Sequence, residues 1–115
     1  MGNTQQRGRD AEDRAAALLS RHGLRLMQRN YRCRGGEIDL VMRDGELLVF
    51  VEVRFRNSVA FGGALVSIDQ RKRRRLLNAA NHFIVNSGWQ GPFRFDVVGF
   101  DGDREAHWIR DAFPA

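Results

Sequence analysis

Residues 36–55 read GEIDLVMRDGELLVFVEVRF, and this stretch decides the fold that we predict for the chain. It contains two apolar runs, residues 38–42 and 47–51, with an Asp44–Gly45 pair between them. An Asp-Gly pair in that position is typical of a β-hairpin, because glycine adopts the positive φ of a type I′ turn at little steric cost. The sequence therefore predicts two antiparallel strands joined by a tight turn at Asp44 and Gly45.

The pattern on either side of this hairpin predicts two helices and three further strands. Helical spacing of apolar residues followed by a glycine marks each helix, and apolar runs rich in β-formers mark each strand. We expect helices at about residues 4–22 and 67–86, a glycine loop at 61–63, and strands at about 24–32, 93–100 and 106–109 around a turn at 101–103. The predicted class is α/β, in the order α-β-β-β-α-β-β, with a mixed central sheet of about five strands flanked by helices.

Length and composition predict one globular domain over residues 1–115. The net charge of +5 favours a polyanionic partner such as nucleic acid, although an anionic membrane surface or a purely solubilising role would also fit. The single cysteine, Cys33, excludes an intramolecular disulfide. The chain has no apolar signal core and no run of membrane-spanning length, so we expect a cytoplasmic protein without a membrane partner.

Four charged residues are expected to lie together on the hairpin. Strand side chains alternate between faces, so Glu37 shares a face with Asp39, and Glu52 shares one with Arg54. A two-residue turn at the Asp-Gly pair would place Glu37 opposite Glu52 and Asp39 opposite Phe50. All four charged groups would then project from the same side of the sheet.

Glu52 lies within an apolar run that predicts a buried strand, so its charge needs compensation. One source is a salt bridge to Arg54 or to another arginine. The other is a divalent cation, because clustered carboxylate oxygens suit hard ions such as Mg²⁺ or Mn²⁺. Glu12, at the edge of the buried stripe of the first helix, would either complete such a site or face solvent.

The hairpin resembles a known nuclease signature. Residues 36–41 (GEIDLV) and 50–54 (FVEVR) are similar to the PD-(D/E)XK nuclease superfamily, which carries an acid on one strand and acid-x-lysine on the next. With Ala11-Glu12 upstream and residues 94–98 (RFDVV) downstream, the chain is more closely similar to the YraN-like family of bacterial endonuclease-like proteins, over about residues 7–100. The resemblance implies a restriction endonuclease-like core.

The same resemblance implies metal-dependent hydrolysis of phosphodiester bonds in DNA, including branched or single-stranded DNA. It implies that Mg²⁺ or Mn²⁺ is held by Asp39, Glu52, the backbone carbonyl of Val53 and the helical acid Glu12. Glu37 would be a further ligand or would support the other ligands. In such sites the metal activates water and stabilises the charge that develops on the scissile phosphate.

Arg54 stands where the superfamily has lysine. A guanidinium stays protonated and cannot act as a general base, although it can orient water or clamp a phosphate. Lys72 would supply the missing ammonium if the second helix packs over the site; otherwise it is a solvated or phosphate-contacting charge. The alternative function is therefore a non-catalytic nucleic-acid-binding or complex-assembly module that keeps the fold.

A run of basic residues begins the second helix and predicts phosphate contacts, with a merely solvated face as the alternative. The residues expected to contact nucleic acid are Arg54, Arg56, Arg71, Lys72, Arg73, Arg74 and Arg75. Phosphate contacts position a protein without specifying bases, so the sequence gives no base preference. Cleavage of two strands would call for a homodimer, which no residue pattern identifies.

Overall fold

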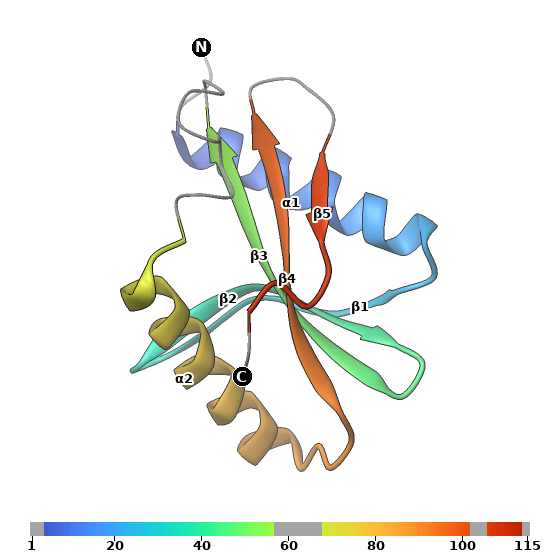
Figure 1. Ribbon diagram of the computed structural model, residues 1–115, viewed down its shortest axis with the longest axis vertical. Helices are drawn as coiled ribbons and strands as arrows, with labels where there is room; N and C mark the ends of the chain where they lie inside the picture. The colour runs from blue at the N-terminus through green and yellow to red at the C-terminus, as the bar shows by residue number, and fades with distance from the viewer. Residues whose placement is uncertain (1–3, 57–67, 102–105, 114–115) are drawn as a thin grey trace.

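The computed structural model contains the two helices and five strands in the predicted order (Figure 1). It describes residues 4–56, 68–101 and 106–113. The expected glycine loop at residues 61–63 and most of the expected turn at 101–103 lie outside this description. The elements are α1 (Thr4–Arg21), β1 (Arg25–Cys33), β2 (Gly36–Asp44), β3 (Leu47–Arg56), α2 (Gln70–Ser87), β4 (Phe93–Asp101) and β5 (His107–Ile109).

The strands form one mixed sheet in the order β1-β2-β3-β4-β5. The β3–β4 pair is parallel and is connected through α2, whereas the β1–β2, β2–β3 and β4–β5 pairs are antiparallel. The sheet is strongly twisted, so that β1 and β2 cross the direction of β3 and β4 (Figure 1). The α/β class and the mixed five-stranded sheet are confirmed.

The two helices cover opposite faces of the sheet, and both use small residues to lie close to it. On one face, a core cluster unites α1 with the sheet through Ala11, Ala15, Ala16, Leu19, Leu40, Met42, Val49, Val51, Val98 and Phe100. On the other face, a second core cluster unites α2 with the sheet. Its α2 residues are Leu76, Ala79 and Ala80, and its strand residues include Ile38, Val41, Leu48, Phe50, Phe95 and Val97. None of the helices in the described part of the chain is long and apolar enough to cross a membrane.

The hairpin forms as predicted, but its turn and register differ. The last pair of the β2–β3 ladder is Asp44 opposite Leu47, so Gly45 and Glu46 form the turn instead of Asp44 and Gly45. Gly45 has φ +61°, which fits the first central position of a type II′ turn, where glycine is preferred. The shift changes each strand partner by two residues, an even number, which by itself moves no side chain to the other face. The expectation that Glu37 and Asp39 share one face is nevertheless wrong, because Ile38 packs beneath α2 and Leu40 packs beneath α1, so the alternation of β2 breaks at Asp39.

Candidate functional site

The strands β2 and β3 separate beyond the pair Leu40–Val51, and the acids lie at this point of separation, which we call the fork. Their pairing extends from the turn to Leu40 opposite Val51, whereas β3 stays paired with β4 as far as Arg56. Just beyond this ladder, the Asp39 side chain takes the place of a strand partner, because its Oδ2 accepts a hydrogen bond from the Val53 N–H at 2.8 Å. The fork fixes Asp39 against β3 at the residue after Glu52.

Glu52 is the buried acid at this fork. Its side chain is only 2% exposed. Its Oε2 lies 3.2 Å from Nη1 of Arg54 and 3.4 Å from Nζ of Lys72, whereas its Oε1 is buried and has no hydrogen-bond partner among the described residues. The expected salt bridge to Arg54 is therefore present, and Oε1 accepts no hydrogen bond from the described residues.

The electrostatics of Glu52 follow from this burial. Loss of hydration raises the pKa of its carboxyl group to about 8, and the negative charge of Asp39 acts in the same direction. Lys72 and Arg54 oppose the rise and do not cancel it. At neutral pH the carboxyl group therefore tends to hold a proton.

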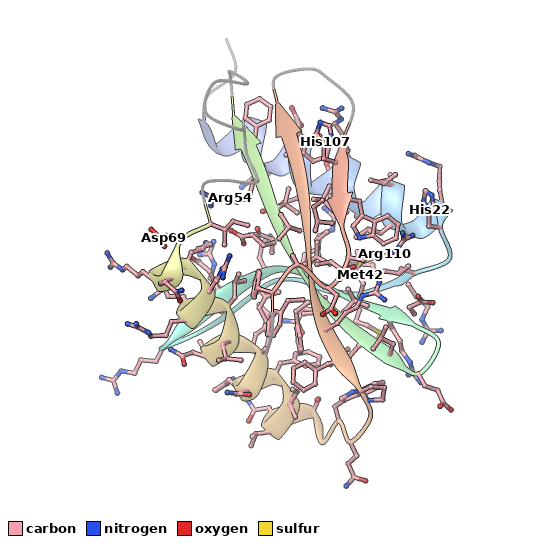
Figure 2. All side chains as sticks on the ribbon, viewed as in Figure 1. His22, Met42, Arg54, Asp69, His107 and Arg110 are labelled. Atoms are coloured by element: carbon pink, nitrogen blue, oxygen red, sulfur yellow. The ribbon has the colours of Figure 1, made fainter. Side chains whose placement is uncertain are left out.

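Lys72 reaches the acids from α2. Its Nζ lies 3.4 Å from Oε2 of Glu52 and 3.9 Å from Oε1 of Glu37, and its side chain is 24% exposed. The helix begins beside the site because the Asp69 side chain caps it, accepting the Lys72 N–H at 2.9 Å. In Figure 2, Asp69 and Arg54 lie on the same side of the view, near the start of α2. The structure thus brings an ammonium to the fork from an element distant in sequence.

Close packing of α2 on the first residue of β2 makes this approach possible. A Cβ built on Gly36 would lie 1.8 Å from the backbone oxygen of Arg75, a distance that no side chain allows. Nearby, the Asn78 amide donates a hydrogen bond to the Gly35 carbonyl at 3.1 Å. The Gly35–Gly36 pair therefore does more than end a strand, because it fixes the helix that carries Lys72.

Glu37 lies at the outer side of the site. It is 38% exposed, and its carboxylate lies 3.9 Å from Lys72 and also 3.9 Å from Nε of Arg32. Register places it opposite Arg32 on β1. Glu37 is thus shared between two cations, which fits a supporting acid better than a ligand in the centre of the site.

Glu12 approaches the fork from α1. It is half-buried; burial raises the pKa of its carboxyl group, and the negative charge of Asp39 adds to the rise. The neighbouring Asn30 side chain and the charge of Arg29 act in the opposite direction. The structure therefore places Glu12 close enough to Asp39 for the two charges to interact, and it adds Asn30, which the sequence did not single out.

The basic run of α2 divides among several environments. Arg71, Arg73 and Arg74 are exposed, and the Arg73 guanidinium lies over the Phe113 ring, 5.2 Å from its centroid. Arg75 is half-buried beside the Gly36 contact. The side chain of Arg56 lies outside the described residues. The run therefore presents three exposed arginines on the helix that carries Lys72, and contacts of this run with nucleic acid stay a prediction.

The acids at the fork fit a hard divalent cation. In the described ranges 4–56, 68–101 and 106–113, no group of three or more Asp, Glu, His or Cys side chains forms a ligand set for a metal ion. Mg²⁺, however, is often held by one or two carboxylates together with waters and substrate phosphates. Asp39 and Glu52 could supply two such carboxylates, and ligation by Asp39, Glu52, Glu12 and the Val53 carbonyl stays a prediction.

Comparison with known proteins gives a consistent result over nearly the whole chain. The uncharacterised protein family UPF0102 matches residues 11–100. A protein of Dechloromonas aromatica is 54% identical over 97% of this chain and 92% of its own length. One of Pseudomonas fluorescens is 50% identical over 97% and 96%, and one of Halorhodospira halophila is 53% identical over 94% and 87%. Each of the three is described only as a UPF0102 protein.

Proposed function

Since the chain belongs to the uncharacterised protein family UPF0102, as the resemblance to YraN-like proteins indicated, we propose its function from its own side chains: a divalent-metal-dependent phosphodiesterase that cleaves DNA. One observation carries the proposal. The Glu52 carboxyl group is 2% exposed, stands beside a second acid, Asp39, and keeps one oxygen without a hydrogen-bond partner within the described residues. A purely structural ion pair would be expected to satisfy both oxygens of a buried carboxylate.

Asp39 and Glu52 would hold Mg²⁺ or Mn²⁺, with Glu12 near enough to complete or support the set. When bound, such an ion polarises a phosphoryl oxygen and lowers the pKa of coordinated water. The Val53 N–H keeps Asp39 oriented, since it donates to Oδ2 at 2.8 Å. Burial of Glu52 excludes bulk water from one side of the site, which strengthens electrostatic interactions there.

Lys72 and Arg54 would act on the substrate phosphate. Both cations contact Oε2 of Glu52, so a phosphate bound beside this carboxylate would meet two positive charges. These charges would stabilise the extra negative charge of the transition state. Lys72 would supply the ammonium that the superfamily places at the position of Arg54, and Arg54 would clamp a phosphate oxygen or orient water.

A substitution of Lys72 tests its part in this scheme. We expect Lys72→Met to lower the cleavage rate by about 100-fold or more, the range typical of the loss of one charge-stabilising group. Asn81→Ala, an exposed residue further along α2, is the matched control and should retain wild-type activity. Equal rates for Lys72→Met and wild type would remove Lys72 from the mechanism.

The DNA backbone would approach along the first turns of α2. Arg71 and Arg74 are exposed there, and they belong to the same helix that delivers Lys72 to the acids. Phosphate contacts of this type release counterions and make binding depend on salt. They would guide a strand toward the fork without reading its bases.

The second candidate function is a nucleic-acid-binding module without turnover, and the observation in its favour is Arg54 at the position of the superfamily lysine. Arg54→Lys separates the two functions. A gain of cleavage over an inactive wild-type protein would favour the binding module. A wild-type protein that cleaves, and that Asp39→Asn inactivates, would exclude it.

Cleavage of labelled oligonucleotides is the direct experiment. The wild-type protein is incubated with Mn²⁺ and with single-stranded, duplex, flapped and four-way DNA, and with RNA of the same sequence. Cleavage that falls by about 100-fold or more in Asp39→Asn and Glu52→Gln is the expected result. Glu46→Gln, an acid exposed in the hairpin turn, should cleave as the wild type does. No cleavage of any substrate, or equal cleavage by Glu52→Gln, would refute the proposal.

A further inference from the structure

Two arginines face each other across the β1–β2 pair, at the end of the hairpin that is distant from the fork. Arg25 is the first residue of β1, and its register partner is Arg43, close to the β2–β3 turn. Residues directly opposite each other in an antiparallel pair carry their side chains on the same face. Like charges in that arrangement repel each other, so the pair destabilises the sheet unless an anion lies beside it.

Neither of these arginines has an acidic partner in the part of the chain that the structure describes. The acids of the adjacent turn, Asp44 and Glu46, are exposed and form no ion pair with either arginine within those residues. Ion pairs are formed instead by Arg29, Arg32, Arg54, Lys72 and Arg94. The two opposed charges therefore lack compensation from the described side chains.

The guanidinium of Arg43 is held in place without being neutralised. Its Nε donates a hydrogen bond to the Gly45 carbonyl at 2.6 Å, and its guanidinium carbon lies 5.2 Å from the ring centroid of Trp89. The indole of Trp89 is itself fixed, because its Nε1 donates to the Pro92 carbonyl at 3.1 Å. A guanidinium that is oriented before binding loses less entropy when it binds an anion. Arg43 is thus preorganised for a ligand of negative charge.

A hollow of about 340 Å³ lies beside this pair, lined by Gly23, Arg25, Arg43 and Gly45. A Cβ built on either glycine would meet no heavy atom beyond its chain neighbours within 4 Å, so both turns leave open space. The β2–β3 turn lies on the right of the view in Figure 1, whereas the start of α2, which carries Lys72, lies on the left. The hollow is therefore separate from the fork.

The number of donors favours a phosphate group over a carboxylate in this hollow. One guanidinium can satisfy both oxygens of a carboxylate in a bidentate pair. A phosphate group presents more acceptor oxygens, which suits two guanidinium groups on one side. The net charge of +5 also attracts polyanions to the protein.

We propose that the hollow between Arg25 and Arg43 binds a phosphate group, supplied by a nucleic-acid backbone or by a free phosphorylated compound. Arg43 provides the preorganised guanidinium, and Arg25 provides the second charge. No acid of the fork takes part. The site therefore goes beyond the proposed function and depends on neither metal binding nor cleavage.

Titration of inorganic phosphate into the metal-free protein tests the site, with NMR of the arginine Nε–H resonances and the ionic strength held constant with NaCl. We expect saturable shifts of the Arg25 and Arg43 resonances. Arg25→Gln and Arg43→Gln should each weaken binding by about 10-fold or more, since each loses charge-assisted hydrogen bonds. Arg34→Gln, an exposed position beyond the other end of β1, removes the same charge and should bind as the wild type does.

Arg43→Lys distinguishes a built site from diffuse positive charge. Lysine keeps the charge and lacks the planar fork, so this variant should also bind phosphate more weakly than the wild type. Wild-type affinity of Arg43→Lys, shifts that do not saturate, or an equal loss in Arg34→Gln would overturn the proposal. Arg25 is exposed, so Arg25→Gln keeps the test decisive if the Arg43 variants do not fold.

Two further titrations identify the source of the phosphate. One uses a thymidine mononucleotide with a 5′-phosphate, and the other uses a short oligothymidylate without terminal phosphates. Shifts of the Arg25 and Arg43 resonances with the oligonucleotide assign the site to a nucleic-acid backbone, and shifts with phosphate and the mononucleotide alone assign it to a free phosphorylated compound. No shift with any of the three overturns the proposal. A protein that shows the shifts but binds no Mn²⁺ and cleaves no DNA would refute the proposed function and keep this site.

Discussion

Replacement of Glu52 by glutamine should change how stability depends on pH. The pKa of Glu52 rises from an ordinary 4.5 to about 8 in the folded protein, so the folded state holds a proton that the unfolded state releases between these values. The stability that this proton provides is complete below pH 4.5 and is lost as the pH rises through about 8. Each unit of pKa difference between the folded and unfolded states corresponds to about 1.36 kcal/mol, so the free energy of unfolding falls by at most about 5 kcal/mol.

Glu52→Gln keeps the shape of the side chain and cannot ionise. In metal-free buffer, we expect the free energy of unfolding of the variant to be close to that of the wild type near about pH 5. Above about pH 8, we expect the variant to be more stable than the wild type by about 2 to 5 kcal/mol. Urea denaturation at a series of pH values measures both proteins, with Glu46→Gln as the exposed control. Parallel curves for wild type and Glu52→Gln across this range would refute the electrostatic account of the site.

Three further predictions concern packing, burial and charge. Gly36→Ala should lower the free energy of unfolding, measured by chemical denaturation, by about 1 to 3 kcal/mol, because its Cβ meets the α2 backbone. Gly8→Ala, at a helical position with open space around it, should raise the free energy of unfolding by about 0.5 to 1 kcal/mol. Asp96→Asn should cost about 3 to 5 kcal/mol, since this buried carboxylate pairs with an arginine and anchors the segment after β5, and a thermal melt above the wild-type Tm would contradict this. Replacing Arg71 and Arg74 together by glutamine should reduce the slope of log Kd against log salt for DNA by about 2, and an unchanged slope would exclude both contacts.

Much of the fold follows from the apolar pattern, but the hairpin register does not. A turn at Asp44–Gly45 and one at Gly45–Glu46 place the same side chains in the core, so burial alone does not distinguish them. The choice depends on the backbone of Gly45, with its positive φ at the first turn position. A partner shift of two residues was therefore invisible to the pattern that identified the strands.

The site was predictable where it depends on neighbouring strands and unpredictable where it depends on packing. Asp39 and Glu52 meet because they lie on one hairpin. Lys72 is delivered by α2, and its approach depends on Gly36, whose glycine signal was interpreted only as the end of a strand. The break in the alternation of β2 at Asp39 gave no signal, since the pattern that identifies a strand assumes regular alternation.

The central claim, that the acids at the fork hold a divalent cation, is tested most directly by calorimetric titration of Mn²⁺ into the metal-free protein. The titration is made with and without a short single-stranded DNA, for wild type, Glu52→Gln and Glu46→Gln. Binding to the wild type and to Glu46→Gln is predicted, with proton release near about pH 7 because Mn²⁺ displaces the proton of Glu52, and none to Glu52→Gln. No binding to a folded wild-type protein under either condition, or equal binding by Glu52→Gln, would contradict the account.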